Sequence, residues 1–189
     1  PPLDTLVYGP QAGLLPSEAS RKRYNKRGAV GAGRFGDQVN PERLSSATQF
    51  YIVTGMTFPA EQLDTLEQVN DVTELRHFAD RYAARPENAW IRTLDYKRLK
   101  KERPAMLDSI NTLIKQAYLK ERGRFTFDSD MRKTYMEVGG APSLDAGYTV
   151  FGEVVAGMDV AERISRSVTI QGGTRPVEPI IFSIELLHD

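Results

Sequence analysis

The hydrophobic and polar positions of the chain first form a strand pattern in residues 45–55. The segment from Gln49 to Val53 is rich in β-branched and aromatic residues, follows small polar residues and ends near Gly55, so it predicts a β-strand. With a period of two, Phe50 and Ile52 share the face predicted to join the core. The opposite face carries Gln49, Tyr51 and Val53. That second face is predicted to be either a binding surface or an ordinary solvated strand face.

Between residues 57 and 133 the apolar spacing becomes helical. Pro59 suits a first helical position, and Asp71 is predicted to cap a second helix that Pro86 ends. A third amphipathic segment runs from residue 107 to residue 118 and is expected to end at Gly123. His77 lies among charged residues of the second helix, so we expect it on the surface and not in a metal site.

After Tyr135 the strand pattern returns. Residues 139–147 predict a tight loop, residues 148–155 a strand, and residues 158–164 the apolar side of a short helix. A last strand is predicted from Val177 to Leu187, with its alternate apolar side chains on one face. These four apolar residues are Ile180, Phe182, Ile184 and Leu186.

Length and charge then narrow the function classes. The chain has 189 residues, with 25 basic and 25 acidic ones, so no overall field favours nucleic acid or an anionic membrane, and polyanion binding would have to be local. It contains no cysteine, which removes thiol chemistry, and no apolar run long enough for a membrane span. Because it opens with Pro1 and Pro2, we expect it to be the remainder of a longer precursor.

Two local motifs suggest phosphate binding, but each has a simpler interpretation. Gly31, Gly33 and Gly36 form a G-x-G-x-x-G, yet the strand before it and the helix after it that a dinucleotide site requires are not predicted. A strand past which another backbone comes close fits better. The basic cluster in residues 21–27 allows a phosphate patch, although a solvated face is favoured.

Several motifs together resemble cyclophilin, the peptidyl-prolyl isomerase family. They are the segment 49–52, the segment from Leu144 to Val154, the residues 157–160 that follow it, and Arg175-Pro176-Val177, which is similar to bacterial members. The resemblance implies a mainly β fold, a cyclophilin-like antiparallel barrel of eight strands with a shallow proline pocket on its outer face. Residues 1–56 and 134–189 would form the barrel portion, and residues 57–133 would be a helical insertion.

The resemblance also implies the substrate-binding residues. Gln49 matches a glutamine that hydrogen-bonds the substrate backbone, and Tyr51 matches a phenylalanine at the floor of the pocket. Gly33, Arg34 and Phe35 fall where the family binds peptide through its backbone. Leu144 matches a pocket leucine, whereas Ser143 replaces a tryptophan and Tyr148 replaces a histidine.

One departure leaves the mechanism open. The amino-terminal segment that carries the catalytic arginine of the family does not occur in this sequence, so the barrel is expected to be incomplete and no catalytic residue is assigned. The predicted function is peptidyl-prolyl cis-trans isomerisation (EC 5.2.1.8) that assists protein folding; the alternative is a catalytically weak peptide-binding or chaperone module. A separating test is whether the chain catalyses isomerisation of an Ala-Pro peptide.

The expected partners follow from this function. They are proline-containing peptides or unfolded polypeptides, and a missing amino-terminal segment or second chain that completes the barrel. Neither nucleic acid, metal nor cofactor is expected. The compartment is not fixed by the sequence, and the bacterial periplasm or cell envelope is favoured over the cytoplasm.

Overall fold

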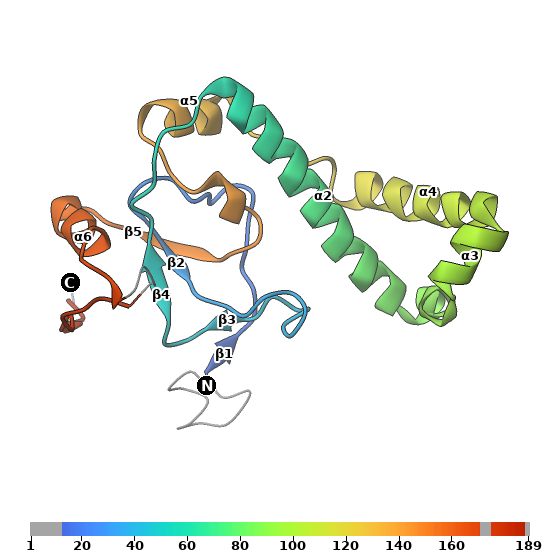
Figure 1. Ribbon diagram of the computed structural model, residues 1–189, viewed down its shortest axis with the longest axis horizontal. Coiled ribbons are helices and arrows are strands. Elements are labelled where there is room, and N and C mark those ends of the chain that lie inside the picture. Colours follow the sequence, from blue (N-terminus) through green and yellow to red (C-terminus); the bar gives the residue numbers. More distant parts are fainter. Residues whose placement is uncertain (1–12, 171–174, 188–189) are drawn as a thin grey trace.

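A small antiparallel sheet and a long helical arm make up the computed structural model, which describes residues 13–170 and 175–187 (Figure 1). The strands are β1 (Leu14–Leu15), β2 (Ala29–Ala32), β3 (Ser45–Ser46), β4 (Phe50–Ile52) and β5 (Val150–Glu153). The helices are α2 (Ala60–Ala84), η1 (Pro86–Thr93), α3 (Tyr96–Glu102), α4 (Pro104–Glu121), α5 (Ser129–Glu137), η2 (Pro142–Leu144) and α6 (Met158–Ser165). Helical residues far outnumber strand residues in this part of the chain. The prediction of a mainly β fold is therefore wrong.

The central strand of the main sheet is β2. It pairs antiparallel with β4 on one side, where Gly31 faces Tyr51, and with β5 on the other, with an irregularity between Val30 and Gly31. β1 and β3 form a separate two-stranded ladder. Both sheets are open in the described residues, so the structure shows no closed barrel. Segments 49–52 and 150–153, which are about a hundred residues apart, nevertheless lie on either side of one strand.

The two faces of β4 are the reverse of those predicted. Val53 is buried with Ala29 and Val150 in a cluster that Tyr51 also joins, whereas Phe50 is 43% exposed and Ile52 36% exposed. The cause is what covers each face. Ala141 packs on the Val53 side, while the ring described near Phe50 is that of Phe182, in an edge-on contact with centroids 6.1 Å apart.

The predicted last strand from Val177 to Leu187 is also wrong. This segment has no strand in the structure, and most of its apolar side chains are exposed, Ile181 to 93%. Just before it, one isolated bridge joins Thr169 to Pro176. No strand of residues 13–170 pairs with this alternating segment, and a strand needs such pairing to satisfy its backbone.

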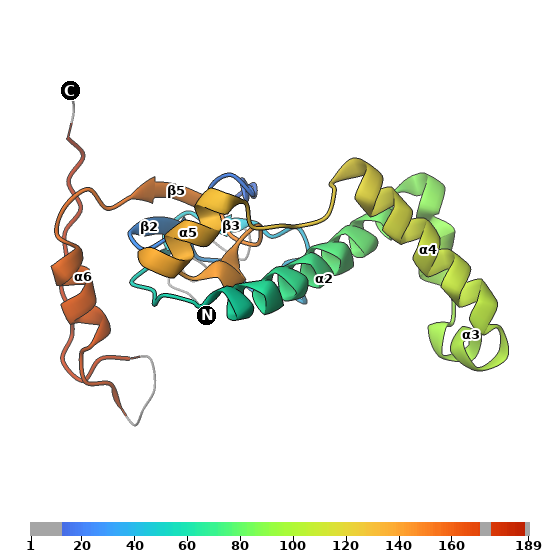
Figure 2. The same cartoon turned by 90° about the horizontal axis from the view of Figure 1, so that it is seen from above.

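One helix replaces the two that were predicted between Pro59 and Pro86. α2 runs unbroken for 25 residues, begins after Pro59 and ends before Pro86. Its distal half packs on η1 and α4, and α3 packs on α4, around a core of their own. We call residues 75–118 the arm, because they extend away from the sheet (Figures 1 and 2). The buried members of its core are Phe78, Ala83, Ile91, Ile110, Ile114 and Tyr118.

The base of the insertion shares a core with the sheet end of the molecule. The segment 122–128, which leads back from α4 to α5, is called the returning segment. Leu63 from the start of α2 packs with Met131 and Tyr135 of α5 and with Phe125 and Phe127 of the returning segment. Tyr24, Phe58 and Ala146 lie against this cluster. The first turns of α2 and residues 125–135 thus pack against segments that adjoin the sheet.

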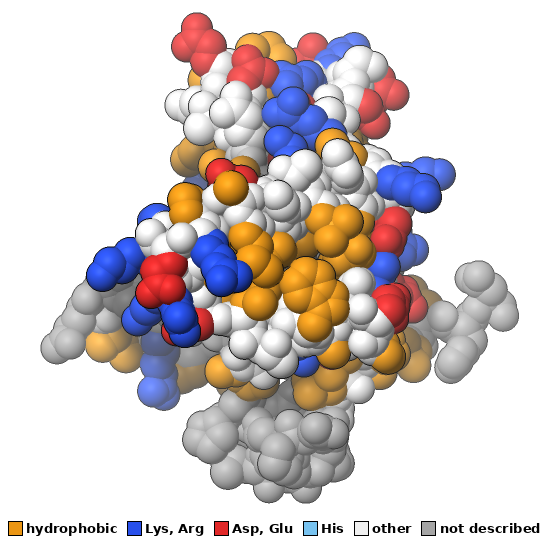
Figure 3. Space-filling model, turned by 90° about the vertical axis from the view of Figure 1, so that its right-hand side faces the viewer, with side chains coloured by type: hydrophobic (Ala, Val, Ile, Leu, Met, Phe, Trp, Pro, Cys, Tyr) orange, Lys and Arg blue, Asp and Glu red, His pale blue; other side chains and the backbone are white. Residues whose placement is uncertain are grey.

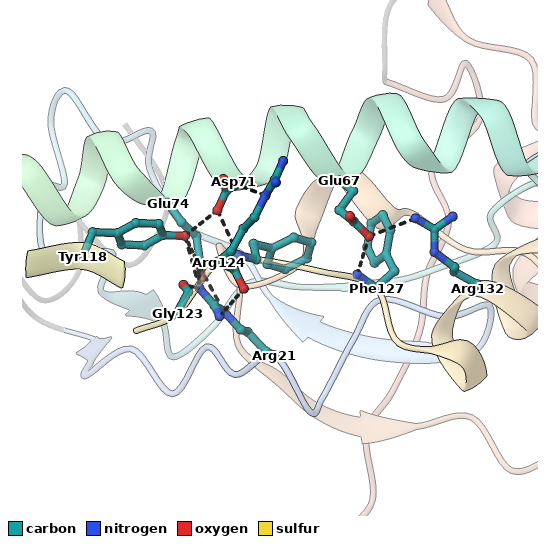
Figure 4. Close-up of polar contacts among 10 residues, drawn as sticks. Arg21, Glu67, Asp71, Glu74, Tyr118, Gly123, Arg124, Phe127 and Arg132 are labelled. Carbon is teal, nitrogen blue, oxygen red and sulfur yellow. Dashed lines mark hydrogen bonds and ion pairs between the residues drawn. The ribbon is translucent and has the colours of Figure 1, made fainter. Parts of the chain in front are cut away.

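Three acidic side chains along α2 hold the returning segment in place (Figure 4). Glu67 accepts hydrogen bonds from the Phe127 backbone N–H and from Arg132. Asp71 accepts from the Tyr118 hydroxyl and from the Phe125 N–H, both at 2.8 Å. Asp71 therefore acts as a tertiary acceptor within the helix and not as a cap, which accounts for the single helix.

The third acid, Glu74, pairs with Arg21. The Arg21 guanidinium also donates to the backbone carbonyls of residues 122, 123 and 124, at 3.0 to 3.1 Å. The prediction that residues 21–27 form a solvated face is therefore wrong for Arg21, and Arg27 is likewise paired, with Glu162. Lys22 and Arg23 are exposed, as predicted.

Candidate functional site

The Tyr51 ring lies directly over Gly31 of β2, where no side chain occupies the space. A Cβ atom added at Gly31 would lie 2.2 Å from the Tyr51 ring, far inside contact distance. The close approach predicted for the glycine-rich segment is thus present, and the approaching group is an aromatic ring. A dinucleotide motif requires a helix that begins directly after the glycines, whereas residues 37–39 after Gly36 form a turn.

Tyr51, Tyr148 and Arg34 form a stack of three side chains. The Tyr51 and Tyr148 rings meet edge to face with centroids 5.9 Å apart. The Arg34 guanidinium carbon lies 4.5 Å from the Tyr148 centroid, a cation–π geometry. The structure thereby brings together three of the residues that the resemblance implied. Two of them, Tyr51 and Tyr148, come from distant segments and offer neighbouring aromatic surfaces.

Arg34 is itself fixed by polar partners. Its Nε donates to the Gly147 carbonyl at 2.7 Å, and its Nη1 donates to Asp37 at 2.7 Å and to the Phe35 carbonyl at 2.9 Å. Asp37 also pairs with Arg43. Although burial opposes the effect, hydrogen bonds from Arg43 and Arg34 lower the pKa of Asp37. Arg34 therefore fastens Tyr148 and its loop to the turn after β2.

A series of buried hydrogen bonds, here called the polar chain, connects Tyr51 to the loop that carries Tyr148. The Tyr51 hydroxyl donates to Asn25 Oδ1 at 2.7 Å. Asn25 donates from its backbone N–H and its side-chain amide to Asp145 Oδ1, at 2.8 and 3.0 Å. The Tyr135 hydroxyl donates to Asp145 Oδ2 at 2.6 Å. Asn25, Asp145 and Tyr135 are all buried, so these bonds fix the loop that carries Tyr148.

Burial changes the acidity of this polar chain. Desolvation raises the pKa of Asp145 to about 6, although the hydrogen bonds from Tyr135 and Asn25 act in the other direction. Desolvation also raises the pKa of Tyr51, with smaller contributions from Tyr148 and Asp145. Desolvation raises the pKa of Tyr135 as well. Tyr51 and Tyr135 consequently keep their protons as hydrogen-bond donors near neutral pH.

Gln49 stands at the edge of this cluster with its amide unused. Its backbone carbonyl accepts from the Gly33 N–H at 2.7 Å, which joins two of the candidate segments. Its side chain is exposed and makes no hydrogen bond to another described residue. The amide is therefore free to bind a ligand. Phe35, two residues beyond Gly33, is 42% exposed.

Ser143 and Leu144 lie in η2, just ahead of Tyr148. Ser143 is exposed and Leu144 half-buried. The turn is tied to α2 by the Asn70 amide, which donates to the Pro142 carbonyl at 2.8 Å. The helical insertion thus contributes directly to the position of this turn.

An open hollow of about 520 Å³ lies beside the cluster, and none of the eight candidate residues lines it. Arg43 and Ala146 form its near wall, and Arg43 reaches the Ala146 carbonyl at 3.5 Å. His77 lines it too, with Nε2 3.0 Å from the Pro41 carbonyl. Burial, followed by the charge of Arg43, lowers the pKa of His77. His77 is half-buried, so the expectation of a surface histidine holds only in part.

The residues Asn25, Tyr135 and Asp145 were missed as site residues by sequence reasoning. They are spread over 120 positions and belong to no local pattern. The available signal was Asp145 itself, a carboxylate within a loop of glycine, proline and apolar residues.

In the part of the chain that the structure covers, no group of three or more His, Asp or Glu side chains could hold a metal ion. Nor does any described helix combine the length and apolarity of a membrane span.

The comparison with protein families found one match. Residues 125–185 match the family model of the cyclophilin type peptidyl-prolyl cis-trans isomerase/CLD, roughly a third of the chain. The matched stretch contains Ser143, Leu144 and Tyr148 and excludes Gln49, Tyr51 and residues 33–35. The resemblance inferred from the motifs is thereby confirmed for this stretch. Neither the search of curated proteins nor that of solved structures found a match.

Proposed function

We propose that this chain, whose residues 125–185 match the cyclophilin-type family model, is a peptidyl-prolyl cis-trans isomerase that acts on X-Pro bonds of polypeptides and assists their folding. The observation that carries the proposal is the contact between Tyr51 and Tyr148. One residue lies inside the matched stretch and the other far outside it, yet they form one aromatic surface beside the free Gln49 amide.

The chemistry suits these side chains. Prolyl isomerisation makes and breaks no covalent bond, and its barrier of roughly 18–20 kcal/mol comes from amide resonance. A site lowers the barrier by holding the proline ring on an apolar surface, by excluding water and by holding the flanking backbone. Tyr51 and Tyr148 would supply the surface, Gln49 would bind the backbone, and Gly33, Phe35, Ser143 and Leu144 would border the peptide.

A hydrogen-bond donor to the twisting prolyl nitrogen remains to be supplied. Arg34 is the guanidinium at the cluster, but its Nε and Nη1 are engaged with Gly147, Phe35 and Asp37. We therefore assign Arg34 to positioning. Among the described residues, Arg34 is the one guanidinium that contacts this aromatic pair, so a catalytically weak peptide-binding or chaperone module is the second candidate function.

An additional polypeptide segment would supply both the missing hydrogen-bond donor and a partner for the open edges of the sheet. The apolar face with Phe50 and Ile52 is exposed, and β4 and β5 are edge strands. We propose that another polypeptide segment, from a longer form of this chain or from a second chain, packs on this face and brings the arginine. Intact mass and light scattering on active material should reveal it. A fully active monomer of only these 189 residues would contradict this part of the proposal.

The decisive experiment measures cis-trans exchange of an Ala-Pro peptide by NMR. Gln49→Ala should lower kcat/KM by about 3- to 10-fold, the loss of one hydrogen bond. Tyr51→Ala should lower it at least as much, because the pocket floor is removed. The control is Leu113→Ala, which removes an exposed apolar side chain of α4 in the arm and should leave kcat/KM unchanged.

The possible outcomes separate the two candidate functions. Catalysis lost in both variants and kept in the control supports the isomerase. Peptide binding without catalysis by the parent chain supports the binding module. An equal loss in Leu113→Ala and Tyr51→Ala would show that the loss does not come from the aromatic pair.

A further inference from the structure

The end of the arm carries a concentration of positive charge that the neutral composition of the chain conceals. Residues 90–106 contain six basic and two acidic side chains, a net charge of +4, whereas the whole chain has a net charge of zero. The basic residues are Arg92, Lys97, Arg98, Lys100, Lys101 and Arg103; the acidic ones are Asp95 and Glu102. This local asymmetry points to an anionic partner.

Both acids are engaged within α3. Asp95 caps the helix by accepting from the Arg98 N–H at 3.0 Å, and Glu102 accepts from Arg98 Nε at 2.8 Å. Within the described residues, none of the other five basic side chains pairs with a carboxylate, and all five are exposed. The positive charge at this end is therefore available to another molecule.

Large apolar side chains are exposed at the same end. Trp90 is 44%, Tyr96 43% and Met106 40% exposed. Figure 3 shows hydrophobic side chains gathered in the middle of this end of the molecule with Lys and Arg side chains beside them. On α3, Leu99 packs toward the arm core, while Tyr96 and Lys100 are four residues apart and share the outer side.

From this combination we propose that the end of the arm docks on an anionic phospholipid surface. Tyrosine and tryptophan have an apolar body and a polar tip, so they suit the membrane–water boundary, and lysine stems can lie on apolar surface while their charge reaches the lipid head groups. The end protrudes, which fits a flat surface better than it fits an extended acidic peptide. Figures 1 and 2 place the sheet at the other end of the long axis, so docking leaves the sheet open to substrate. The inference does not depend on the proposed isomerase activity.

Trp90 supplies a direct probe, because it is the only tryptophan in the chain. We would titrate the 189-residue chain with vesicles of equal parts phosphatidylglycerol and phosphatidylcholine and follow Trp90 emission together with co-sedimentation. The expected result is a blue shift that accompanies binding. Binding should weaken from about 0.01 M to about 0.15 M salt, as the Debye length falls from about 30 to about 8 Å. Vesicles of phosphatidylcholine alone should bind weakly or not at all.

Variants locate the contact. Each basic residue near an anionic surface changes partitioning about fivefold, so the quadruple variant K97A/K100A/K101A/R103A should lose binding by a factor of several hundred. K97R/K100R/K101R keeps the charge and should bind normally. The matched control is K22A/K115A/K120A/K133A, four exposed lysines outside residues 90–106 without a carboxylate partner in the described structure, and it should keep the Trp90 shift.

Three results would overturn the proposal. They are the absence of binding to the anionic vesicles at low salt, equal binding by the arm-end quadruple variant and the parent chain, and binding without a change in Trp90 emission. A Trp90 shift with poly-glutamate or an RNA oligonucleotide, and none with vesicles, would likewise replace the lipid by another polyanion. Circular dichroism of each variant checks that α3 and its neighbours remain folded.

Discussion

Single atoms decide the geometry of the candidate site, and position 31 is the clearest case. Gly31 faces the Tyr51 ring, and a methyl group there would overlap it. We expect Gly31→Ala to destabilise the protein by about 1–3 kcal/mol through overpacking and to lower isomerase activity by displacing Tyr51. Gly36→Ala is the control, since nothing lies within 4 Å of its Cβ position. Urea unfolding and peptide exchange measure both effects; equal tolerance of the two substitutions would contradict the packing argument.

Asp145 gives a pH-dependent prediction. Burial raises its pKa from an ordinary 3.8 to about 6 in the folded protein, so folding favours the protonated form. The associated stability is present below about pH 4 and is lost as the pH rises through 6. The loss is on the order of 2–3 kcal/mol, from the two pKa values and about 1.4 kcal/mol per unit.

The test compares Asp145→Asn with the parent chain by urea unfolding at pH 4 and at pH 7. Asparagine cannot ionise, so the variant should gain stability relative to the parent as the pH rises. The difference between the two proteins removes the contributions of other titrating groups. A pH-independent difference for Asp145→Asn would mean that Asp145 does not titrate in this range.

At the scale of elements, sequence patterns located the strands better than they oriented them. The β-branched and aromatic runs at 49–53 and 148–155 did become β4 and β5. The choice of face failed for Phe50 and Ile52 because it depends on what packs on each side, and the strand at 177–187 failed because no strand of the described residues pairs with it. Period two indicates alternation but does not indicate which set of side chains will be covered.

The same limit applies to helices and to the site. Asp71 has the residue type of a helix cap, yet its partners Tyr118 and Phe125 are about fifty residues away and keep it within α2. Tyr51 and Tyr148 could be anticipated only through family motifs. The supporting contacts of Asn25 with Asp145 depend on the tertiary fold and had no sequence pattern to indicate them.

We expect the ion pair of Glu74 on α2 to contribute more to the free energy of unfolding than the exposed ion pair within α3. Arg21→Gln would leave the mostly buried Glu74 carboxylate without its charge partner and three backbone carbonyls without donors. We expect a loss of about 3–5 kcal/mol in the free energy of unfolding. Arg98→Gln breaks the exposed pair with Glu102 and should cost no more than about 0.5 kcal/mol. Urea unfolding of both variants is the measurement, and similar losses would show that the Arg21 contacts are not stabilising.

For the whole molecule, the two cores show where the helical insertion can be cut. The arm has its own buried cluster, whereas Leu63, Phe125, Phe127 and Met131 belong to the core beneath the sheet. The predicted boundaries at 57 and 133 therefore enclose residues that support both parts. Cutting at Phe78 and Tyr118 removes fewer shared residues, and because these two side chains pack across α2 and α4 with ring centroids 5.6 Å apart, we expect a Gly-Ser linker to join the two helices.

We expect replacement of residues 79–117 by such a linker to give a folded protein that keeps its activity on a short Ala-Pro peptide, because every residue of the Tyr51 and Tyr148 cluster and its support remains. It should lose binding to anionic vesicles, because residues 90–106 are gone. Removal of all of 57–133 should instead unfold the sheet end, since it deletes four of the five buried side chains of this cluster and leaves only Tyr135. Circular dichroism, vesicle co-sedimentation and peptide exchange distinguish the two deletions. A folded 79–117 deletion without isomerase activity, made from an active parent, would show that the arm takes part in catalysis, and vesicle binding retained by this deletion would refute the assignment of the arm as the docking element.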